Sequence, residues 1–150
     1  MVVQDKIARG ALASIAATIP QLIFQAVSVV IGLSQYYGFE LSAGVYLPAD
    51  LTKTFWGAVF GVLIWEFAST ILGITTCYII HWTGRSYSWL KGMLVANTIM
   101  FIAIYGYFYA LGGPSIAPSD LGTNWSMLIA NTIFGVACGW LIVRWSPKEE

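Results

Sequence analysis

The chain has 150 residues, of which 58% are hydrophobic and only 9% are charged, and its formal net charge is zero. A soluble domain carries about 25% charged residues, and a core of this size could not bury so much apolar surface. The composition therefore excludes an ordinary water-soluble protein and indicates an integral membrane protein. Because the sequence has no basic run and no zinc-finger spacing, it also argues against nucleic acid as a partner.

Four segments are long and apolar enough to span a bilayer, which takes about 20 residues in a helix. Because the bilayer core offers no water to backbone polar groups, we expect helices in all four. Asp50 or Thr52 is a natural N-cap for the second helix, and Asp120 for the fourth. The predicted fold is all-α: one domain, residues 1–150, forming an integral membrane bundle of four transmembrane helices at about 10–33, 54–80, 92–112 and 121–143.

The distribution of lysine and arginine predicts the orientation of this bundle. With four spans, one side holds six basic residues, namely Lys6, Arg9, Arg85, Lys91, Arg144 and Lys148, and the other side holds only Lys53. Basic residues gather on the cytoplasmic side of membrane proteins. We therefore expect a multi-pass protein of the cell membrane with both termini in the cytoplasm. The first uncharged stretch is longer than the apolar part of a typical signal peptide, so we expect it to stay in the chain.

The first predicted helix carries a regular row of polar and small residues. Successive members lie four and three residues apart, which aligns them along one side of a helix. They are Ser14, Thr18, Gln21, Gln25, Ser28, Gly32 and Gln35. A surface facing lipid has no reason to align polar groups in this way, so this stripe is predicted to face protein or an internal wet cavity.

Glu66 lies near the centre of the second predicted helix, with Ser69 and Thr70 on the same face. An acidic residue at the centre of a spanning helix costs about 2.5 to 3.5 kcal/mol on insertion scales. No cationic residue lies at the same depth on another helix. Two interpretations stay open: a neutral carboxylic acid that donates a hydrogen bond to a glutamine amide, or a group that moves protons or ions.

Asn131 of the fourth helix and Tyr105 of the third lie at a similar predicted depth. Together with the groups above, they predict a polar layer in the middle of the bundle and a possible ion or substrate path. Its members are Glu66, Gln21, Gln25, Asn131, Ser69, Thr70 and Tyr105.

Two pairs of glycines at spacing four predict close helix packing. Gly57 and Gly61 lie on the second helix, on nearly the opposite face from Glu66, and Gly135 and Gly139 lie on the fourth. Glycines at this spacing let helix backbones approach closely. We expect these faces to receive another helix or another subunit.

No motif indicates covalent chemistry. Cys77 and Cys138 do not form a CxxC pair, and His81, the only histidine, is interpreted as an interfacial residue at a helix end rather than a catalyst or ligand. The chain has no HExxH or GxSxG motif. We therefore expect neither a metal nor another cofactor, and we expect a protein that is not an enzyme.

The layout resembles the YqhR type of small bacterial membrane protein. The similarity rests on the length, the four-span plan, the glycine-rich GAVFGVLIW at 57–65 and SYSWLKGMLVAN at 86–97. This group has no established activity, so the resemblance implies only a bacterial inner-membrane protein and transfers no site residue.

Two functions follow from these observations. The first is a non-catalytic accessory or scaffold subunit of a membrane assembly, whose polar layer fixes the register of the helices. The alternative is a small oligomeric transporter, channel or proton-pathway subunit that uses Glu66. In both cases the expected partners are the lipid bilayer and either further copies of the chain or other membrane subunits.

Overall fold

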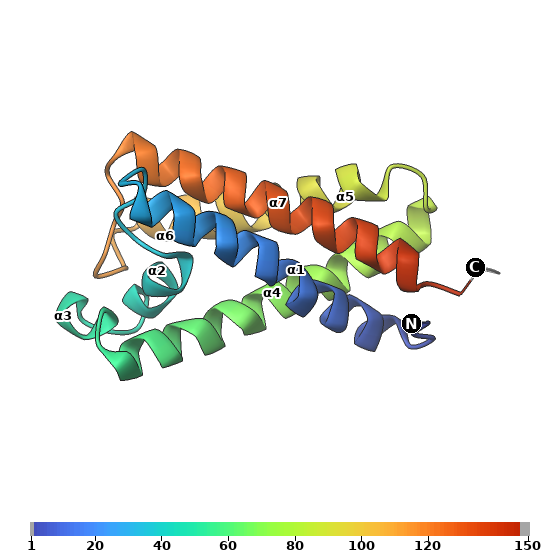
Figure 1. The fold of residues 1–150 in the computed structure, drawn as a ribbon, viewed down its shortest axis with the longest axis horizontal. Coiled ribbons are helices and arrows are strands. Elements are labelled where there is room, and N and C mark those ends of the chain that lie inside the picture. Colours follow the sequence, from blue (N-terminus) through green and yellow to red (C-terminus); the bar gives the residue numbers. More distant parts are fainter. Residues whose placement is uncertain (1, 148–150) are drawn as a thin grey trace.

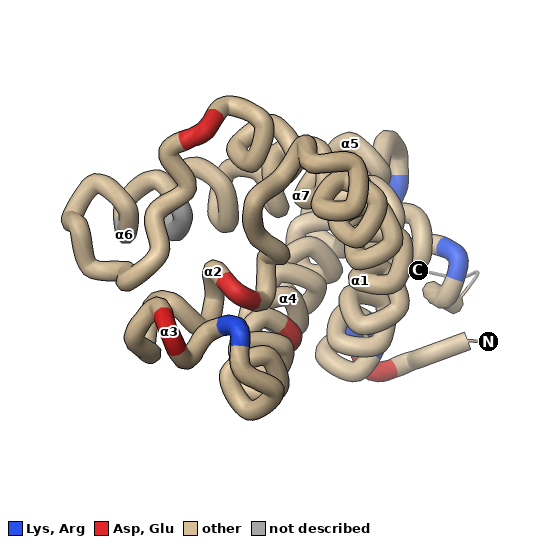
Figure 2. The backbone as a smooth tube through the Cα atoms, turned by 60° about the vertical axis from the view of Figure 1, so that its left-hand side comes forward, with Lys and Arg blue, Asp and Glu red and all other residues tan. Residues whose placement is uncertain are grey.

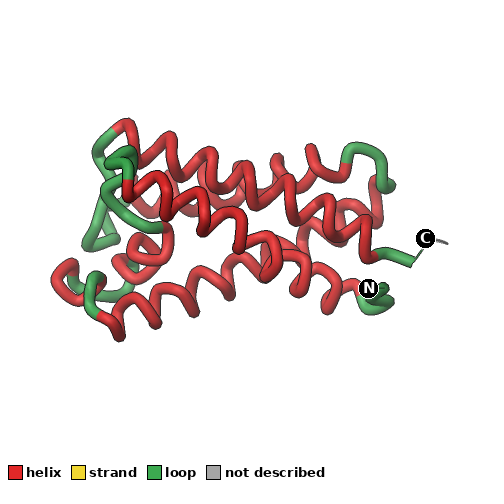
Figure 3. Tube along the Cα trace, in the orientation of Figure 1, coloured by secondary structure: helices red, strands yellow, loops and turns green. Residues whose placement is uncertain are grey.

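The computed structural model describes residues 2–147, apart from the side chains of Ile104, Tyr105 and Phe108, and this part of the chain contains helices and no strands (Figures 1 and 3). The elements in chain order are α1 (Lys6–Val30), α2 (Gly38–Gly44), α3 (Ala49–Thr52), α4 (Phe55–Thr83), α5 (Ser88–Val95), η1 (Ala96–Gly106), α6 (Tyr107–Ala110) and α7 (Leu121–Trp145). The all-helical prediction is confirmed.

Three of the described helices, α1, α4 and α7, are long and apolar enough to cross a membrane. Each begins at a side-chain cap: the oxygens of Asp5, Thr54 and Asp120 accept hydrogen bonds from backbone N–H groups in the first turn. Asp120 caps α7 as predicted, and hydrogen bonds from the backbone and then the side chain of Thr123 lower the pKa of its carboxyl. The expected cap of the second helix is wrong, because Thr54 caps α4 while Asp50 and Thr52 belong to the separate helix α3.

The third apolar segment is not one regular helix. It begins as α5, continues as the π-helix η1 and ends in the single turn α6. Since π-helices occur mostly as single-turn bulges, and often at functional sites, eleven residues of this geometry are unusual. The first helix also differs from the prediction: α1 ends at Val30, and Gly32 has a φ of +76°, which turns the chain out of the helix.

The long elements run back and forth, so that both termini lie at the same end of the bundle (Figure 1). The backbone N–H of Val3 donates to the carbonyl of Trp145, and Lys6 contacts His81 at this end. The tube view shows acidic residues around α2 and α3 at the other end (Figure 2), where Lys53 follows the last residue of α3. We call the two ends the terminal end and the α2–α3 end.

The connection between α1 and α4 holds two short helices and folds back onto the bundle. Helix α2 packs against α4, and a Cβ added at Gly61 would lie 2.2 Å from the carbonyl oxygen of Phe39. A Cβ at Gly57 would lie 1.9 Å from the carbonyl oxygen of Leu51. The Gly57–Gly61 face is therefore filled by the chain's own α2–α3 segment.

Glycines also set the closest contacts between the long elements. Gly92 of α5 and Gly135 of α7 face each other, and a Cβ on either would lie within 2.4 Å of the other's carbonyl oxygen. Gly139 lies equally close to Ser88. Gly10 of α1 and Gly73 of α4 form a second reciprocal pair, which was not predicted. With no side chains between them, these backbones approach as closely as small residues allow.

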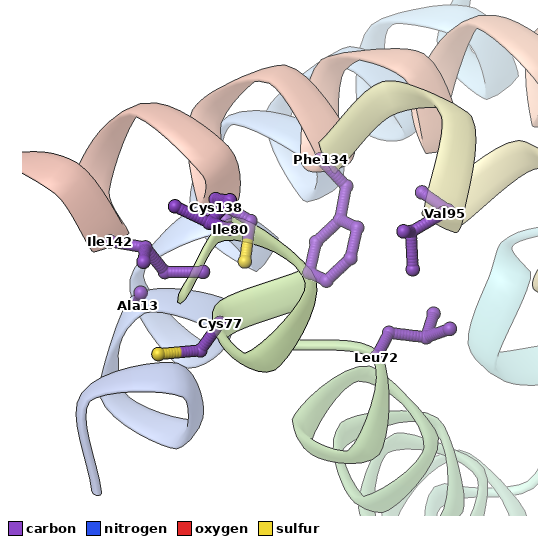
Figure 4. Close-up of a cluster of buried hydrophobic side chains, with 10 residues drawn as sticks. Ala13, Leu72, Cys77, Ile80, Val95, Phe134, Cys138 and Ile142 are labelled. Atoms are coloured by element: carbon purple, nitrogen blue, oxygen red, sulfur yellow. The ribbon is translucent and has the colours of Figure 1, made fainter. Parts of the chain in front are cut away.

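An apolar cluster fills the half of the bundle nearer the terminal end (Figure 4). It is built by α1, α4, α5, α7 and the first residue of η1, and includes Ala13, Leu72, Cys77, Ile80, Val95, Phe134, Cys138 and Ile142. Cys77 and Cys138 are both buried in it and are not joined by a disulfide.

Candidate functional site

The polar stripe of α1 faces the interior along most of its length. Its five members within the helix, Ser14, Thr18, Gln21, Gln25 and Ser28, are each at most 2% exposed. The last two, Gly32 and Gln35, are exposed because they follow the end of the helix. α1 packs against both α4 and α7, so the stripe lies between these helices.

Glu66 contacts this stripe through Thr18. The hydroxyl oxygen of Thr18 lies 2.9 Å from Glu66 Oε1 and 2.7 Å from the carbonyl oxygen of Ile15. The other carboxyl oxygen of Glu66, Oε2, is buried and has no hydrogen-bond partner within residues 2–147. The expected hydrogen bond from Glu66 to a glutamine amide is absent from this part of the chain, where the threonine takes that position instead.

The two glutamines link α1 to different parts of the bundle. Gln21 Nε2 donates to Asn131 Oδ1 of α7 at 3.2 Å. Gln25 Oε1 accepts from the backbone N–H of Gly38 at 3.1 Å, and its amide nitrogen lies 3.8 Å from the sulfur of Met127. Gln25 therefore holds the start of α2 against α1 and α7.

The remaining predicted members lie around this centre. Ser69 is buried one turn beyond Glu66, and Thr70 is half-buried. The side chain of Tyr105 falls outside the part of the chain that the structure describes. Of the predicted layer, the structure joins Gln21 with Asn131 directly, while Glu66 reaches the stripe only through Thr18.

Two further polar groups were not predicted as members. Asn97 Nδ2 of η1 donates to the hydroxyl of Thr132 on α7 at 3.0 Å, a link between the third segment and the fourth. Ser126 is fully buried on α7. Both are visible in the sequence as polar residues within apolar segments, but neither was included in the predicted polar layer.

Several buried polar atoms in this region have no hydrogen-bond partner among the described residues. Besides Glu66 Oε2, they are Gln21 Oε1, Asn97 Oδ1 and Ser126 Oγ. Most buried polar atoms in proteins are hydrogen-bonded, and an exception calls for an explanation such as a bound water or ion. Ordered water is the usual partner of such atoms in protein interiors.

A cavity of about 80 Å³ adjoins this polar region, towards the α2–α3 end. Its polar lining comes from Gln25, Ser42, Tyr109 and Asn131, and its apolar lining includes Trp65, Met100 and Met127. A single water needs only about 10 to 15 Å³ of such volume, so the cavity has room for several. It brings together α1, α2, α4, η1, α6 and α7 around Gln25 and Asn131.

Within the described residues, no three His, Cys, Asp or Glu side chains come together in a way that could hold a metal ion. Comparisons with protein-family models, with curated proteins and with solved structures found no match.

Proposed function

We propose that the protein is a four-span integral membrane protein of the cell membrane that moves protons or small cations through its polar interior, with Glu66 as the exchanging group. No covalent chemistry is assigned to it. The third apolar segment, from Ser88 to Ala110, supplies the fourth span in this proposal, together with α1, α4 and α7. The observation that carries the proposal is the arrangement of Glu66 and Thr18.

One hydroxyl hydrogen cannot serve two acceptors well. Thr18 Oγ1 lies within hydrogen-bond distance of both the Ile15 carbonyl, which can only accept, and Glu66 Oε1. All three groups are satisfied when Glu66 carries a proton and donates it to Thr18, which in turn donates to Ile15. When Glu66 has lost that proton, the one hydroxyl hydrogen of Thr18 can be donated to the Ile15 carbonyl or to the Glu66 carboxylate, but not fully to both. The direction of the hydrogen bond between Thr18 and Glu66 therefore depends on whether the carboxyl carries a proton.

The position of Glu66 along the bundle supports an exchange role. The cavity beside Gln25 and Asn131 lies on one side of it along the bundle, and the apolar cluster of Figure 4 lies on the other. Water entering from the α2–α3 end would reach the polar layer but not pass the apolar cluster. A cavity on one side and an apolar barrier on the other are expected of the closed state of an ion path that opens to one side of the membrane at a time or only briefly.

The orientation proposed for the chain has both termini in the cytoplasm. Lys6, Arg9, Arg85, Lys91 and Arg144 lie at the terminal end, and Lys53 lies at the α2–α3 end. This arrangement follows the rule that basic residues remain on the cytoplasmic side. The cavity would then face outward.

The decisive experiment measures proton and cation flux in proteoliposomes for the wild type and Glu66→Gln. Glutamine keeps nearly the same volume and can still donate to Thr18, but it does not titrate, so we expect a folded protein without flux. Thr18→Val should reduce flux by removing the hydroxyl relay. Thr75→Val is its matched control, because the Thr75 hydroxyl donates to the carbonyl oxygen of Ile71 in its own helix. Unchanged flux in Glu66→Gln, or no flux in the wild type, would refute the proposal.

A second candidate, an accessory subunit that binds other membrane helices, is favoured by one surface. Ala103, Gly106 and Ala110 of the third segment are small residues spaced three and four apart, and all three are exposed. Small residues let a partner helix approach closely. By contrast, the glycine pairs that were expected to receive another helix or another subunit are packed against other segments of this chain. If the protein is such a subunit, its oligomeric state should be unchanged in Glu66→Gln and should be lost in Gly106→Leu.

A further inference from the structure

The third apolar segment is held differently at its two ends. At one end, α5 packs tightly on α7 through the reciprocal contact of Gly92 with Gly135. At the other end, the single turn α6 packs chiefly against η1. Between them the backbone of Ala96–Gly106 follows π geometry, which proteins mostly use for a single turn and often at functional sites. A segment fixed mainly at one end is free to change its winding without disturbing α1, α4 and α7.

The sequence of this segment has an α-helical register that the π-helix does not follow. At about 100° per residue, an α-helix that continues from Gly92 brings a row of small residues back to the side of Gly92, which faces α7. The row consists of Ala96, Ala103, Gly106 and Ala110. Its first member is 1% exposed, but the last three are exposed. These three residues would reach α7 only if the segment were α-helical throughout.

The two geometries differ by a large rotation. Each hydrogen bond of a π-helix spans one residue more than that of an α-helix, so a turn takes about one residue more than 3.6. Over the length of η1 the difference adds up to roughly half a turn. This rotation accounts for the exposure of the last three small residues. It also accounts for Phe101, which an α-helix would direct to the side opposite Gly92 and which here packs against the apolar cluster around Met127.

We propose that the third segment switches between the π-helix described here and a continuous α-helix, a rotation of α6 that moves one wall of the cavity beside Gln25 and Asn131. Tyr109 of α6 lines that cavity, and the rotation takes it out of the wall. Each form has its own stabilising contacts, because the π form packs Phe101 into the interior and the α form packs the small residues against α7. The proposal does not require Glu66 to exchange a proton.

The α form also fits the membrane. As one α-helix, residues 88–110 would extend about 35 Å, which exceeds the hydrocarbon core of about 30 Å. Helix register shifts take microseconds to milliseconds, so the two forms would interchange many times during a chemical cross-linking experiment. A cross-link that only the α form allows would therefore accumulate even if that form is the minor one.

The test is a disulfide cross-link in the full chain in membranes. If the α-helix continues, Gly106 lies opposite Leu121, because both are equally far along the antiparallel helices from the contact of Gly92 with Gly135. In the π form Gly106 is exposed, and the nearest described atom to a Cβ there is the Phe101 carbonyl oxygen at 3.6 Å. Gly106→Cys and Leu121→Cys are combined and oxidised with copper phenanthroline. The wild type, whose two cysteines are buried, gives the background. We expect a cross-link within one chain, and its absence, or cross-links only between chains, would overturn the proposal.

Matched variants of the cross-linking protein show whether the α form is responsible. Ala103→Leu adds bulk to the row of small residues, so it should obstruct packing against α7 and slow cross-linking by about tenfold or more. It should leave the π form folded, because Ala103 is exposed there. Thr98→Leu is the control, since Thr98 is also exposed on η1 but lies about 120° from the row in an α-helix. Equal rates of cross-linking in the two variants would contradict the switch.

Discussion

The contact between Gly92 and Gly135 gives the clearest quantitative prediction about the bundle. In Gly135→Ala the added Cβ would lie 2.4 Å from the carbonyl oxygen of Gly92, whereas ordinary contacts begin at 3.4 Å. The opposing atoms are backbone, which cannot rotate away as a side chain can. Helices α5 and α7 must therefore separate by about 1 Å locally, and we expect a loss of about 1 to 3 kcal/mol in the free energy of unfolding, the usual cost of overpacking.

The assay is unfolding in mixed micelles by titration with dodecyl sulfate, followed by tryptophan fluorescence. Gly106→Ala is the matched control, because the nearest atom to its added Cβ is 3.6 Å away. There alanine should be neutral or stabilise the helix by up to about 1 kcal/mol. The double variant Gly92→Ala with Gly135→Ala should cost less than the sum of the single changes, since the helices separate only once. A Gly135→Ala protein as stable as the wild type would refute the described crossing.

Three further predictions concern the site, the cap of α7 and the orientation. Gln25→Leu leaves the buried N–H of Gly38 without its acceptor and should lower the free energy of unfolding by about 1 to 3 kcal/mol. Ile23→Leu, on the exposed face of the same helix, should change it by much less. Equal effects of the two substitutions would contradict the site. The Asp120 carboxyl has its pKa lowered from 3.8 by hydrogen bonds from Thr123, so its contribution is present above that pH and is lost as the pH falls through the lower, folded-state value; acid unfolding curves should show this loss in the wild type and not in Asp120→Asn. Introduced cysteines at the exposed Ser119 and Ser86 should react with an impermeant maleimide from outside and from inside intact cells respectively, and labelling of Ser86→Cys from outside would refute the orientation.

Periodicity predicted the buried face of α1 well, because polar side chains in an otherwise apolar helix are unfavourable against lipid and therefore face the protein interior. The 4–3 spacing that placed Thr18, Gln21 and Gln25 on one side correctly predicted their burial. The same pattern failed at Gly32 and Gln35, because it reports which residues align if a helix continues and not where the helix ends. The positive φ of Gly32 ends it.

The partners of these groups were harder to predict than their faces. Sequence spacing within a helix does not fix the rotation of its neighbour, so Glu66 was paired with glutamine although Thr18 lies in its place. The α2–α3 segment was missed for a related reason. Its polar ends and Pro48 are typical of a loop, and the close approach of Phe39 to Gly61 becomes visible only when both backbones are placed.

The hydrogen bond between Gln21 and Asn131 joins positions 110 residues apart, and this separation has a consequence for synthesis. A ribosome adds about 5 to 20 residues per second, so Gln21 is made roughly 5 to 20 s before its partner exists. If α1 enters the bilayer first, its polar row must meanwhile be kept from lipid by water in the insertion channel or by a transient companion helix. When α7 is inserted, it supplies Asn131 as the lasting partner of Gln21 and displaces the water or the transient helix. A chain truncated before α7 would consequently remain with the insertion machinery instead of diffusing into the membrane.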